Sequence, residues 1–296
     1  MNVRIDQDLC EACGICGHVC PRHIPETIDN GNGKLTTISQ DREGLCMQCG
    51  HCMAVCPNNA IQVDRLKEEE FVSVNGNDVN EDQLLSLLQQ RRSVRRYKNK
   101  KVPREVINRI IDAVRCSPTG SGRMATGVIV IDNPKILEKL SDLLYDAYEG
   151  LGKALKNPIA RIMIKKKKGK NKLLTLQNFV MPGMQWYIQW YREEKSNEIL
   201  RDCPALILFH SPVNEPVGAE NCLIAAFHAI LMAQVMNIGT CFNDLIPPMC
   251  NRVREIRDLL GLSNDREVYA GLTMGYPKYK FKRTIPRKLA EVNYLE

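Results

Sequence analysis

Long apolar runs, aromatic residues and nucleotide-binding glycine patterns are scarce in this chain of 296 residues. Aromatic side chains make up 6% of the sequence, and only two of them are tryptophans. The longest apolar stretch, residues 222–236, contains His228 and Gln234 and is shorter than the roughly 18 to 20 residues that cross a bilayer. No apolar signal core precedes Cys10, and no G-x-G-x-x-G motif is present. We therefore expect no membrane span, no secretion and no Rossmann-type fingerprint for a dinucleotide.

The remaining composition is that of an ordinary globular protein, with 44% apolar and 25% charged residues. The length exceeds one typical domain and predicts one large or two unequal domains. Cysteine is the exception, because the chain holds 13 of them. Without a sign of secretion, so many thiols indicate metal ligation in a reducing cytoplasm.

Eight of the cysteines form an internal repeat. Each copy reads C-x2-C-x2-C-x3-C-P, which is the bacterial spacing for iron–sulfur clusters. Three thiolates on a tight loop can bind three corners of a cubane, and the fourth ligand must then come from elsewhere in the chain. The copies are Cys10, Cys13, Cys16 and Cys20 with Pro21, and Cys46, Cys49, Cys52 and Cys56 with Pro57.

We expect the two copies to exchange their last ligands, as this spacing does in two-cluster proteins. Structural zinc and disulfides are the alternatives, but a tetrahedral zinc site closes with two cysteine pairs and leaves the third and fourth thiols of each copy unexplained. Residues 1–66 thus resemble a bacterial two-cluster ferredoxin domain. The predicted ligands are Cys10, Cys13, Cys16 and Cys56 for one [4Fe–4S] cluster, and Cys20, Cys46, Cys49 and Cys52 for the other.

The other five cysteines lack the spacing of metal ligands. We expect them to be small buried apolar side chains, and we predict no catalytic thiol. They are Cys116, Cys203, Cys222, Cys241 and Cys250.

A charged, turn-rich linker is expected at residues 67–80, before a second domain at 81–296. Asn80 and Gln83 predict a capped helix N-terminus, and Pro103 begins a second helix with apolar residues at helical spacing. Apolar, β-branched runs at 128–131, 205–209 and 268–274 predict buried strands, and residues 220–236 predict a long central helix. The second domain is therefore an α+β domain with a central mixed sheet flanked by helices.

A basic run at residues 91–96 holds four arginines and a serine at the end of an apolar helix. Guanidinium forks and a hydroxyl suit a phosphate, although a solvated charged face is the commoner reason for such a run. Four features of the chain resemble the FMN-dependent nitroreductase family in their order and spacing. They are R-R-S-x-R-x-Y, S-P-T-G before a strand, a long helix that ends at residues 237–242, and a final G-Y-P with P-R-K. The resemblance covers residues 81–296.

The resemblance implies which residues bind FMN. The arginine and serine motif would hold the phosphate and ribityl chain, and a basic pair near the C-terminus would complete the phosphate site. The S-P-T-G segment would reach the flavin from the other subunit of a domain-swapped homodimer, and a glycine and a threonine would lie beside the isoalloxazine ring. The implied residues are Arg91, Arg92, Ser93 and Arg95; Arg287 and Lys288; Pro118, Thr119, Gly120 and Ser121; and Gly239 and Thr240.

The chain departs from the family pattern after the S-P-T-G segment. Many relatives continue with asparagine and glutamine before P-W, whereas residues 122–126 read Gly-Arg-Met-Ala-Thr. An amide that commonly lines the flavin site is therefore missing. FMN remains the expected cofactor, but the substrate preference of those relatives does not carry over.

A second basic run, residues 161–172, carries seven basic side chains and no acidic one. We expect a solvated loop here rather than a nucleic-acid site. Both tryptophans follow, at 186 and 190, beside Tyr187 and Tyr191. They predict either a core face or a lid over the flavin, and the sequence leaves both open.

Charge is divided unequally along the chain. Residues 1–66 hold 5 basic and 8 acidic side chains, a net charge of −3, and the rest carries +10. The basic part suits an acidic ferredoxin as an external electron donor, and NAD(P)H is the other candidate donor.

We therefore predict an FMN-dependent oxidoreductase in which two [4Fe–4S] clusters supply electrons to FMN and an organic acceptor such as a nitroaromatic or quinone receives them. No catalytic acid or base is predicted. The alternatives are an electron-transfer or regulatory module that relays electrons to a partner protein, and an oxygen- or enone-reducing flavoenzyme on the same scaffold. We expect a cytoplasmic homodimer from an anaerobe, with no membrane and no nucleic-acid partner.

Overall fold

The computed structural model describes residues 3–74, 76, 78–122, 124–288 and 291–295. Its backbone divides into two compact units: Met1–Asp78 with Thr119–Met124, and Val79–Pro118 with Ala125–Glu296. The assignment of residues 119–124 to the first unit was not expected from the sequence. The predicted linker at 67–80 stays a prediction.

The first unit consists of short helices and two antiparallel strand pairs around a small core. Strand β1 pairs with β4, and β2 pairs with β3. Val3, Met53 and Val63 belong to the core, and several cysteines pack against it. A tight turn at residues 31–33 joins β2 to β3. The elements are β1 (Val3–Ile5), α1 (Ile15–Val19), β2 (Pro25–Asp29), β3 (Lys34–Ile38), α2 (His51–Val55) and β4 (Ile61–Val63), with 3-10 turns at Glu43–Leu45 and Glu68–Glu70.

The second unit contains a four-stranded sheet in the order β5-β6-β8-β7. Neighbouring strands pair antiparallel, and a parallel bridge joins Ser93 to Thr240 beside β7. The three predicted strand runs are confirmed, and β7 adds a fourth strand. The strands are β5 (Gly127–Ile131), β6 (Ala205–Pro212), β7 (Gly239–Phe242) and β8 (Arg266–Gly275).

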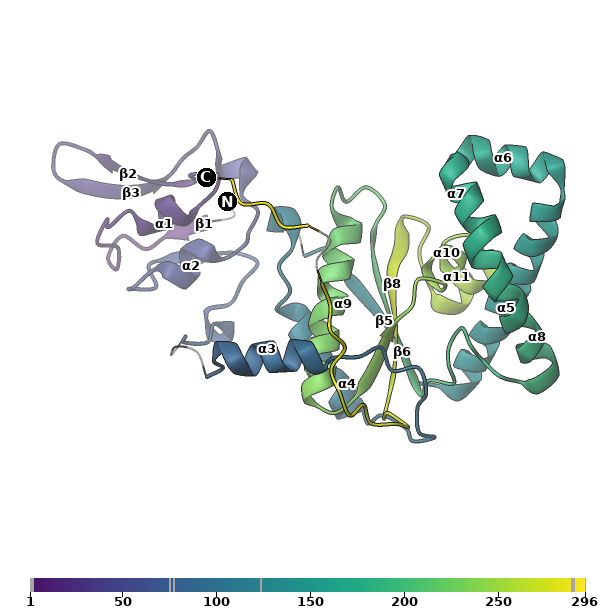
Figure 1. Cartoon of the computed structure of the whole chain (residues 1–296). Helices are drawn as coiled ribbons and strands as arrows, with labels where there is room; N and C mark the ends of the chain where they lie inside the picture. Colours follow the sequence, from purple (N-terminus) through teal and green to yellow (C-terminus); the bar gives the residue numbers. More distant parts are fainter. Residues whose placement is uncertain (1–2, 75, 77, 123, 289–290, 296) are drawn as a thin grey trace. The chain divides into compact units, whose positions relative to one another are not determined.

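Helices cover both faces of this sheet (Figure 1). The odd-numbered residues from 205 to 209 pack with α4 and α9, whereas the even-numbered ones pack in the cluster that contains α5, α10 and α11. Because both faces are covered, β6 is a continuous apolar run rather than an alternating one. The helices are α3 (Glu81–Gln90), α4 (Arg104–Arg115), α5 (Pro134–Lys156), α9 (Gly218–Val235), α10 (Pro247–Cys250) and α11 (Arg254–Leu260), with a 3-10 turn at Gly120–Gly122.

The helix starts predicted from capping residues are confirmed. The Asn80 side chain accepts a hydrogen bond from the Gln83 N–H at 2.9 Å, and the Gln83 side chain accepts one from the Asn80 N–H at 3.1 Å. Pro103 is the N-cap of α4. These reciprocal contacts satisfy backbone donors that a helix leaves unpaired.

Helix α9 is central on one side only. By length and composition it could cross a bilayer, a test that core helices of globular proteins also pass. Asn221, Ala225 and Ala229 are buried in the protein, but Leu223 and Phe227 are exposed on the other side. The predicted long central helix is therefore buried on its inner face and exposed on its outer face.

Residues 158–194 form a helical lobe together with α5, so the predicted loop at 161–172 is wrong. The Asn157 side chain accepts a hydrogen bond from the Ile159 N–H at 2.8 Å and starts a helix of good helix formers. The Tyr191 ring is buried and stacks on Tyr145 with 3.8 Å between ring centroids. The lobe elements are α6 (Pro158–Lys168), α7 (Lys170–Thr175), a π-helical turn (Leu176–Val180) and α8 (Met181–Glu194).

The five cysteines without metal spacing do not all behave as predicted. Cys203, Cys222, Cys241 and Cys250 are buried, as expected for small apolar side chains. Cys116 is exposed at the end of α4, because it is the residue that caps the helix rather than one on its inner face.

A half-buried histidine, His210, predicts how stability depends on pH. His210 Nδ1 accepts a hydrogen bond from Arg266 Nε at 2.7 Å, and Arg266 Nη2 donates to the Ala125 carbonyl at 2.7 Å. Burial, followed by the charge of Arg266, lowers the pKa of His210 to about 4. A histidine in the unfolded chain titrates near pH 6.5. The unfolded state therefore binds a proton that the folded state rejects, and the free energy of unfolding should fall as pH falls from about 6.5 to about 4.

Because His210 is only half buried, the expected loss at about pH 5 is about 1 kcal/mol. His210→Gln should lack this part of the pH dependence, and His228→Gln is the matched control. Urea unfolding, monitored by tryptophan fluorescence, is measured near neutral pH and near pH 5. An equal loss in wild type and His210→Gln would contradict the assignment.

Candidate functional site

Each predicted set of four thiols lines one cavity of the first unit. The fourth cysteine of each sequence run lies with the first three of the other run, which is the arrangement that exchanged ligands require. The group that these thiols bind stays a prediction. One cavity is lined by Cys10, Cys13, Cys16 and Cys56, and the other by Cys20, Cys46, Cys49 and Cys52.

The sequence repeat is also a repeat of backbone conformation. Ala12 and Gln48, which precede the second cysteine of each run, both have φ of 51°, and Gly14 and Gly50 have φ of 75° and 80°. A positive φ at a residue with a side chain costs about 1 to 2 kcal/mol. In return the Gln48 N–H lies 3.4 Å from Cys46 Sγ, so the turn directs a donor to a sulfur. Such N–H···S contacts stabilise cluster thiolates.

The arrangement of the thiols differs from that of a site for a single metal ion. Among the residues that the structure describes, no three Cys, His, Asp or Glu side chains converge closely enough to ligate one metal ion. A tetrahedral zinc site with Zn–S bonds of about 2.3 Å would bring its sulfurs within about 4 Å of one another. Burial is the largest factor acting on the inner thiols and raises the pKa of Cys52 to about 11. Ligation would therefore release protons.

Three arginines meet in a cavity of the second unit. Arg91 and Arg92 follow helix α3, and Arg287 comes from the C-terminal segment; all three line a cavity of about 730 Å³. The Arg92 side chain is 7% exposed. Its Nη atoms donate to the carbonyls of Arg91 and Arg283 at 3.3 Å, but its buried Nε has no hydrogen-bond partner. A buried N–H donor without a partner is costly and indicates a missing acceptor.

Electrostatics point to an anion in this cavity. Burial, followed by the charges of Arg287 and Arg92, lowers the pKa of Arg91. Within the described part of the chain, no carboxylate forms an ion pair with any of the three. A phosphate would relieve this repulsion and accept from Arg92 Nε, so the residues present fit the FMN phosphate.

A second cavity of about 650 Å³ adjoins the first, and Arg92 lines both. Gly239 lies in its wall, where an added Cβ would come within 2.7 Å of the Val94 side chain. The Val94 N–H donates to the carbonyl of buried Thr240 at 2.8 Å, which fixes the arginine segment against β7. Arg91, Arg92, Arg287 and Gly239 thus line the two cavities, and Ser93 pairs with Thr240 beside them, although neither of these two lines a cavity.

Other predicted flavin contacts lie outside these two cavities. Arg95 and Lys288 are exposed and line neither of them. Pro118, Thr119 and Gly120 line neither as well, the Ser121 side chain lies outside the described part of the chain, and residues 119–124 belong to the first unit. Their contact with FMN stays a prediction. Arg123, in the segment that departs from the family pattern, lies outside the described residues.

Sequence reasoning missed aromatic and basic residues of the C-terminal segment. Tyr276, Tyr279 and Phe281 line the second cavity together with Lys280 and Lys282. The sequence feature that could have identified them is the density of aromatic and basic residues just after the last strand. Phe227 and Phe242 line the first cavity from α9 and β7.

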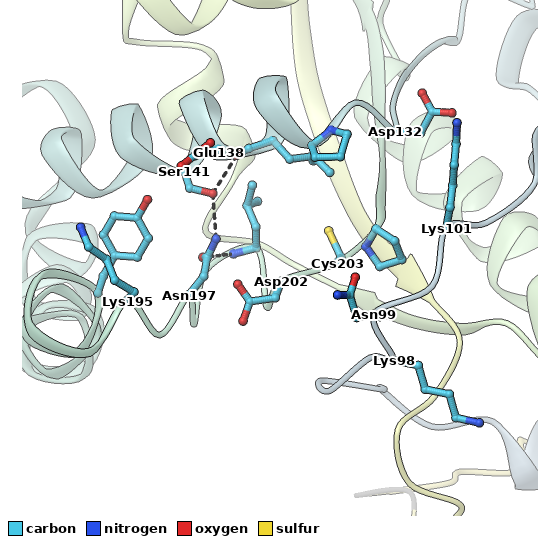
Figure 2. A pocket seen from close by; sticks show the side chains of 15 residues that line it. Lys98, Asn99, Lys101, Asp132, Glu138, Ser141, Lys195, Asn197, Asp202 and Cys203 are labelled. Carbon is cyan, nitrogen blue, oxygen red and sulfur yellow. Dashed lines mark hydrogen bonds between the residues drawn. The ribbon is translucent and has the colours of Figure 1, made fainter.

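A third cavity of the second unit, of about 640 Å³, is built differently (Figure 2). Asn197 lies at its floor, where Nδ2 donates to Ser141 Oγ at 2.7 Å and Oδ1 accepts from the Leu200 N–H at 2.9 Å. Burial raises the pKa of Asp202 there. Three lysines and three carboxylates balance one another, so this cavity favours no ion of one sign. They are Lys98, Lys101, Lys195, Asp132, Glu138 and Asp202.

Comparison with family models gives two matches. Residues 88–276 match the model of the nitroreductase family, and residues 9–61 match the model of a 4Fe-4S dicluster domain. The first match covers more than half of the chain. The second covers all eight repeated cysteines.

Two archaeal relatives are provisionally named NADH dehydrogenase/NAD(P)H nitroreductase. The protein of Archaeoglobus fulgidus is 23% identical over 197 residues, which are 67% of this chain and 87% of that one. The protein of Methanothermobacter thermautotrophicus is 35% identical over 60 residues, 20% of this chain and only 31% of the relative's length.

Solved structures show the same fold. A nitroreductase with bound FMN from Bacteroides fragilis superposes with a TM-score of 0.55 at 19% identity, covering 74% of this chain and 100% of that one. A nitroreductase with bound FMN from Desulfitobacterium hafniense gives 0.52 at 17% identity, covering 72% and 97%. At these identities the likeness concerns the fold alone.

Proposed function

Because the chain belongs to the nitroreductase family and carries a 4Fe-4S dicluster domain, we propose that it is an oxidoreductase that takes electrons through two [4Fe–4S] clusters and FMN to an organic acceptor such as a nitroaromatic or a quinone. FMN, when bound, exchanges single electrons with clusters and electron pairs with organic acceptors. The two thiol-lined cavities support two clusters, and the structural neighbours with bound FMN support the flavin.

The observation that carries the proposal is the membership of residues 119–124 in the first unit. The family resemblance implies that residues 118–121 reach the flavin of the other subunit, and the next residue, Gly122, lies beside Cys49, a predicted cluster ligand. A Cβ added at Gly122 would lie 3.4 Å from Cys49 Cβ, and its φ is +64°. Within the first unit, a segment that adjoins the implied flavin contacts thus lies beside a predicted cluster ligand, which favours electron relay over a purely structural cluster domain.

The chain's own residues have binding and shaping roles. Arg91, Arg92 and Arg287 hold the phosphate, and Arg92 Nε gains the acceptor that it lacks. Gly239 lets Val94 pack closely against β7 in the wall of the adjoining cavity, and the aromatic rings of the C-terminal segment give this cavity a flat apolar lining for an aromatic acceptor. No side chain has to act as an acid or a base.

We also propose a homodimer with FMN at its interface. Leu84, Leu85 and Leu88 on α3 and Leu223 and Phe227 on α9 are exposed apolar residues on two helices in contact. Leu88 and Phe227 also line the arginine cavity. A second copy that covers these residues would therefore close the cofactor site, and the burial of a patch of this kind is a common cause of dimerisation.

Leu223→Glu should convert the dimer to a monomer and weaken FMN retention, because a carboxylate would be buried in the interface. Leu223 itself does not line the arginine cavity, so a direct effect on FMN is not expected. Sedimentation velocity with flavin absorbance measures both. Val213→Glu, at an exposed apolar residue in another part of the unit, is the control. A Leu223→Glu protein that stays dimeric would contradict the interface.

The electron relay is tested by removing residues 1–78, which hold all eight predicted cluster ligands. A chain that starts at Val79 should still bind FMN and still reduce nitroaromatics or quinones with a small chemical reductant, but should lose turnover driven by reduced ferredoxin. Tethering the clusters raises their effective concentration at the flavin, and that advantage disappears. The measurement is acceptor reduction by full-length and shortened chains with each donor in turn. Equal ferredoxin-driven rates would refute the relay.

A point variant tests the electron relay in the full-length chain. Gly122→Val places a side chain against Cys49 at a positive φ and should slow ferredoxin-driven turnover more than chemically driven turnover. Gly31→Val is the matched control, since its φ is +84° and nothing lies within 4 Å of the added Cβ. Steady reduction of a partner protein without turnover of small acceptors would instead favour a relay module.

A further inference from the structure

The helical lobe presents apolar side chains to solvent although its interior is well packed. Leu155, Leu173, Met181 and Met184 are buried inside it. Helix α6 lies across the tip of the lobe (Figure 1). The outward residues are therefore not side chains that failed to find a core.

The exposed apolar side chains of α6 share one face. Ile159, Ile162 and Met163 have helical spacing of three and four residues, and they are 69%, 66% and 55% exposed. Phe179 in the π-helical turn is 82% exposed, and Trp186 on α8 is 59% exposed. Exposed apolar groups in such number mark an interaction surface.

The same part of the lobe is basic and free of acids. From Asn157 to Tyr191 the sequence contains seven basic residues and no acidic one. Arg161, Lys165, Lys166 and Lys167 are exposed, and among the described residues they have no ion-pair partner. On the facing sides of α5 and α8, by contrast, Arg192 pairs with Asp146, and within α5 Lys153 pairs with Glu149. The basic side chains of α6 thus lie on the same helix as its exposed apolar side chains.

We infer that α6, together with the exposed Phe179 and Trp186 of the same lobe, docks on an anionic lipid bilayer. Lysines beside an exposed apolar helix face are the pattern of helices that lie in the plane of a membrane surface. Tryptophan prefers the same interfacial depth. Lysine is depleted in protein interfaces, and a nucleic acid would leave the isoleucine and methionine side chains without partners. The sequence alone predicted no membrane partner, because it does not reveal which side chains are exposed.

The test uses the purified full chain with its cofactors and vesicles of phosphatidylcholine with or without phosphatidylglycerol. Co-sedimentation is expected with the anionic vesicles only, and high salt should weaken it. Because the chain's only tryptophans, Trp186 and Trp190, are both in the lobe, their emission should shift to shorter wavelength and be quenched by brominated lipid. This readout locates the contact independently of enzyme activity.

Two variants separate the apolar and the charge contributions. Ile162→Glu with Met163→Glu, and Lys165→Glu with Lys166→Glu, should each lower vesicle partitioning about tenfold or more. Val213→Glu and the pair Lys135→Glu with Lys139→Glu are matched controls on exposed residues elsewhere, and should leave partitioning unchanged. Unchanged flavin content and circular dichroism show that the variants are folded.

Three results would overturn the inference. The first is failure of the full chain to bind anionic vesicles. The second is vesicle binding that is lost in the control variants but kept in the lobe variants. The third is a change of oligomeric state or of ferredoxin affinity in the lobe variants without a change in vesicle binding. Such a result would mean that the lobe binds a second copy of the chain or an acidic protein instead.

Discussion

Cys56→Ser is expected to remove the cluster held by the first cysteine run, although Cys56 belongs to the second. The Cys56 thiol lines the cavity of Cys10, Cys13 and Cys16. Serine is a poor ligand for iron, so iron and acid-labile sulfide should fall from about eight to about four per chain. Chemical iron and sulfide analysis of anaerobically purified protein measures the loss. Cys116→Ser, at an exposed thiol outside both cavities, is the control.

Pairs of variants decide which cysteines belong together. If the ligands are exchanged, Cys13→Ser with Cys56→Ser damages one site twice and should still leave about four irons per chain. Cys13→Ser with Cys20→Ser damages both sites and should leave almost none. The opposite pattern would show that each run holds its own cluster. Stoichiometric zinc without sulfide in the wild type would end the iron–sulfur assignment.

Arg92→Ala and Arg287→Ala are expected to weaken FMN binding by about ten- to a hundredfold each. Each change removes a charge-assisted contact to phosphate worth roughly 1.5 to 3 kcal/mol. The larger loss of FMN affinity is expected for Arg92→Ala, because the buried Nε of Arg92 lacks any partner until an anion is present. Flavin fluorescence titration of apoprotein measures the dissociation constant.

The two arginine substitutions differ in how strongly they can disturb folding. Arg92 is buried, so its loss can disturb folding, whereas Arg287 is exposed and its loss should leave the fold intact. Arg109→Ala on the exposed side of α4 is the matched control. Unchanged FMN affinity in both Arg92→Ala and Arg287→Ala would place the phosphate elsewhere.

The sequence predicted those parts of the fold that local physical chemistry determines. The cap at Asn80 and the apolar run of β6 needed no tertiary information, because capping side chains and covered strands leave direct patterns. The lobe at 158–194 was missed because its lysines suggested a loop, whereas the Asn157 cap and helix-forming residues outweigh the repulsion between them.

The candidate sites also differ in how far the sequence alone could predict them. The cysteine spacing carries its own geometry, so all eight thiols could be named in advance. The adjoining cavities were foreseen only at the arginine motif, Arg287 and the 239–240 strand. Tyr276 and Phe227 reach them from segments far apart in the sequence, and only the folded chain shows that these segments meet at Arg92. Which residues a second copy would add is a matter of assembly, and no single-chain pattern encodes it.

The discontinuity of the first unit affects the order of synthesis and folding. The chain leaves this unit after Asp78, returns at Thr119 and leaves again after Met124. On a ribosome, the cysteine segment is therefore finished well before the last segment of its own unit has been made. Cluster insertion before that point would occur in a unit still open at residues 119–124, where Cys49 lacks its neighbour Gly122. Translation speed through α4 thus becomes a determinant of how long the nascent cluster site is exposed to oxidants.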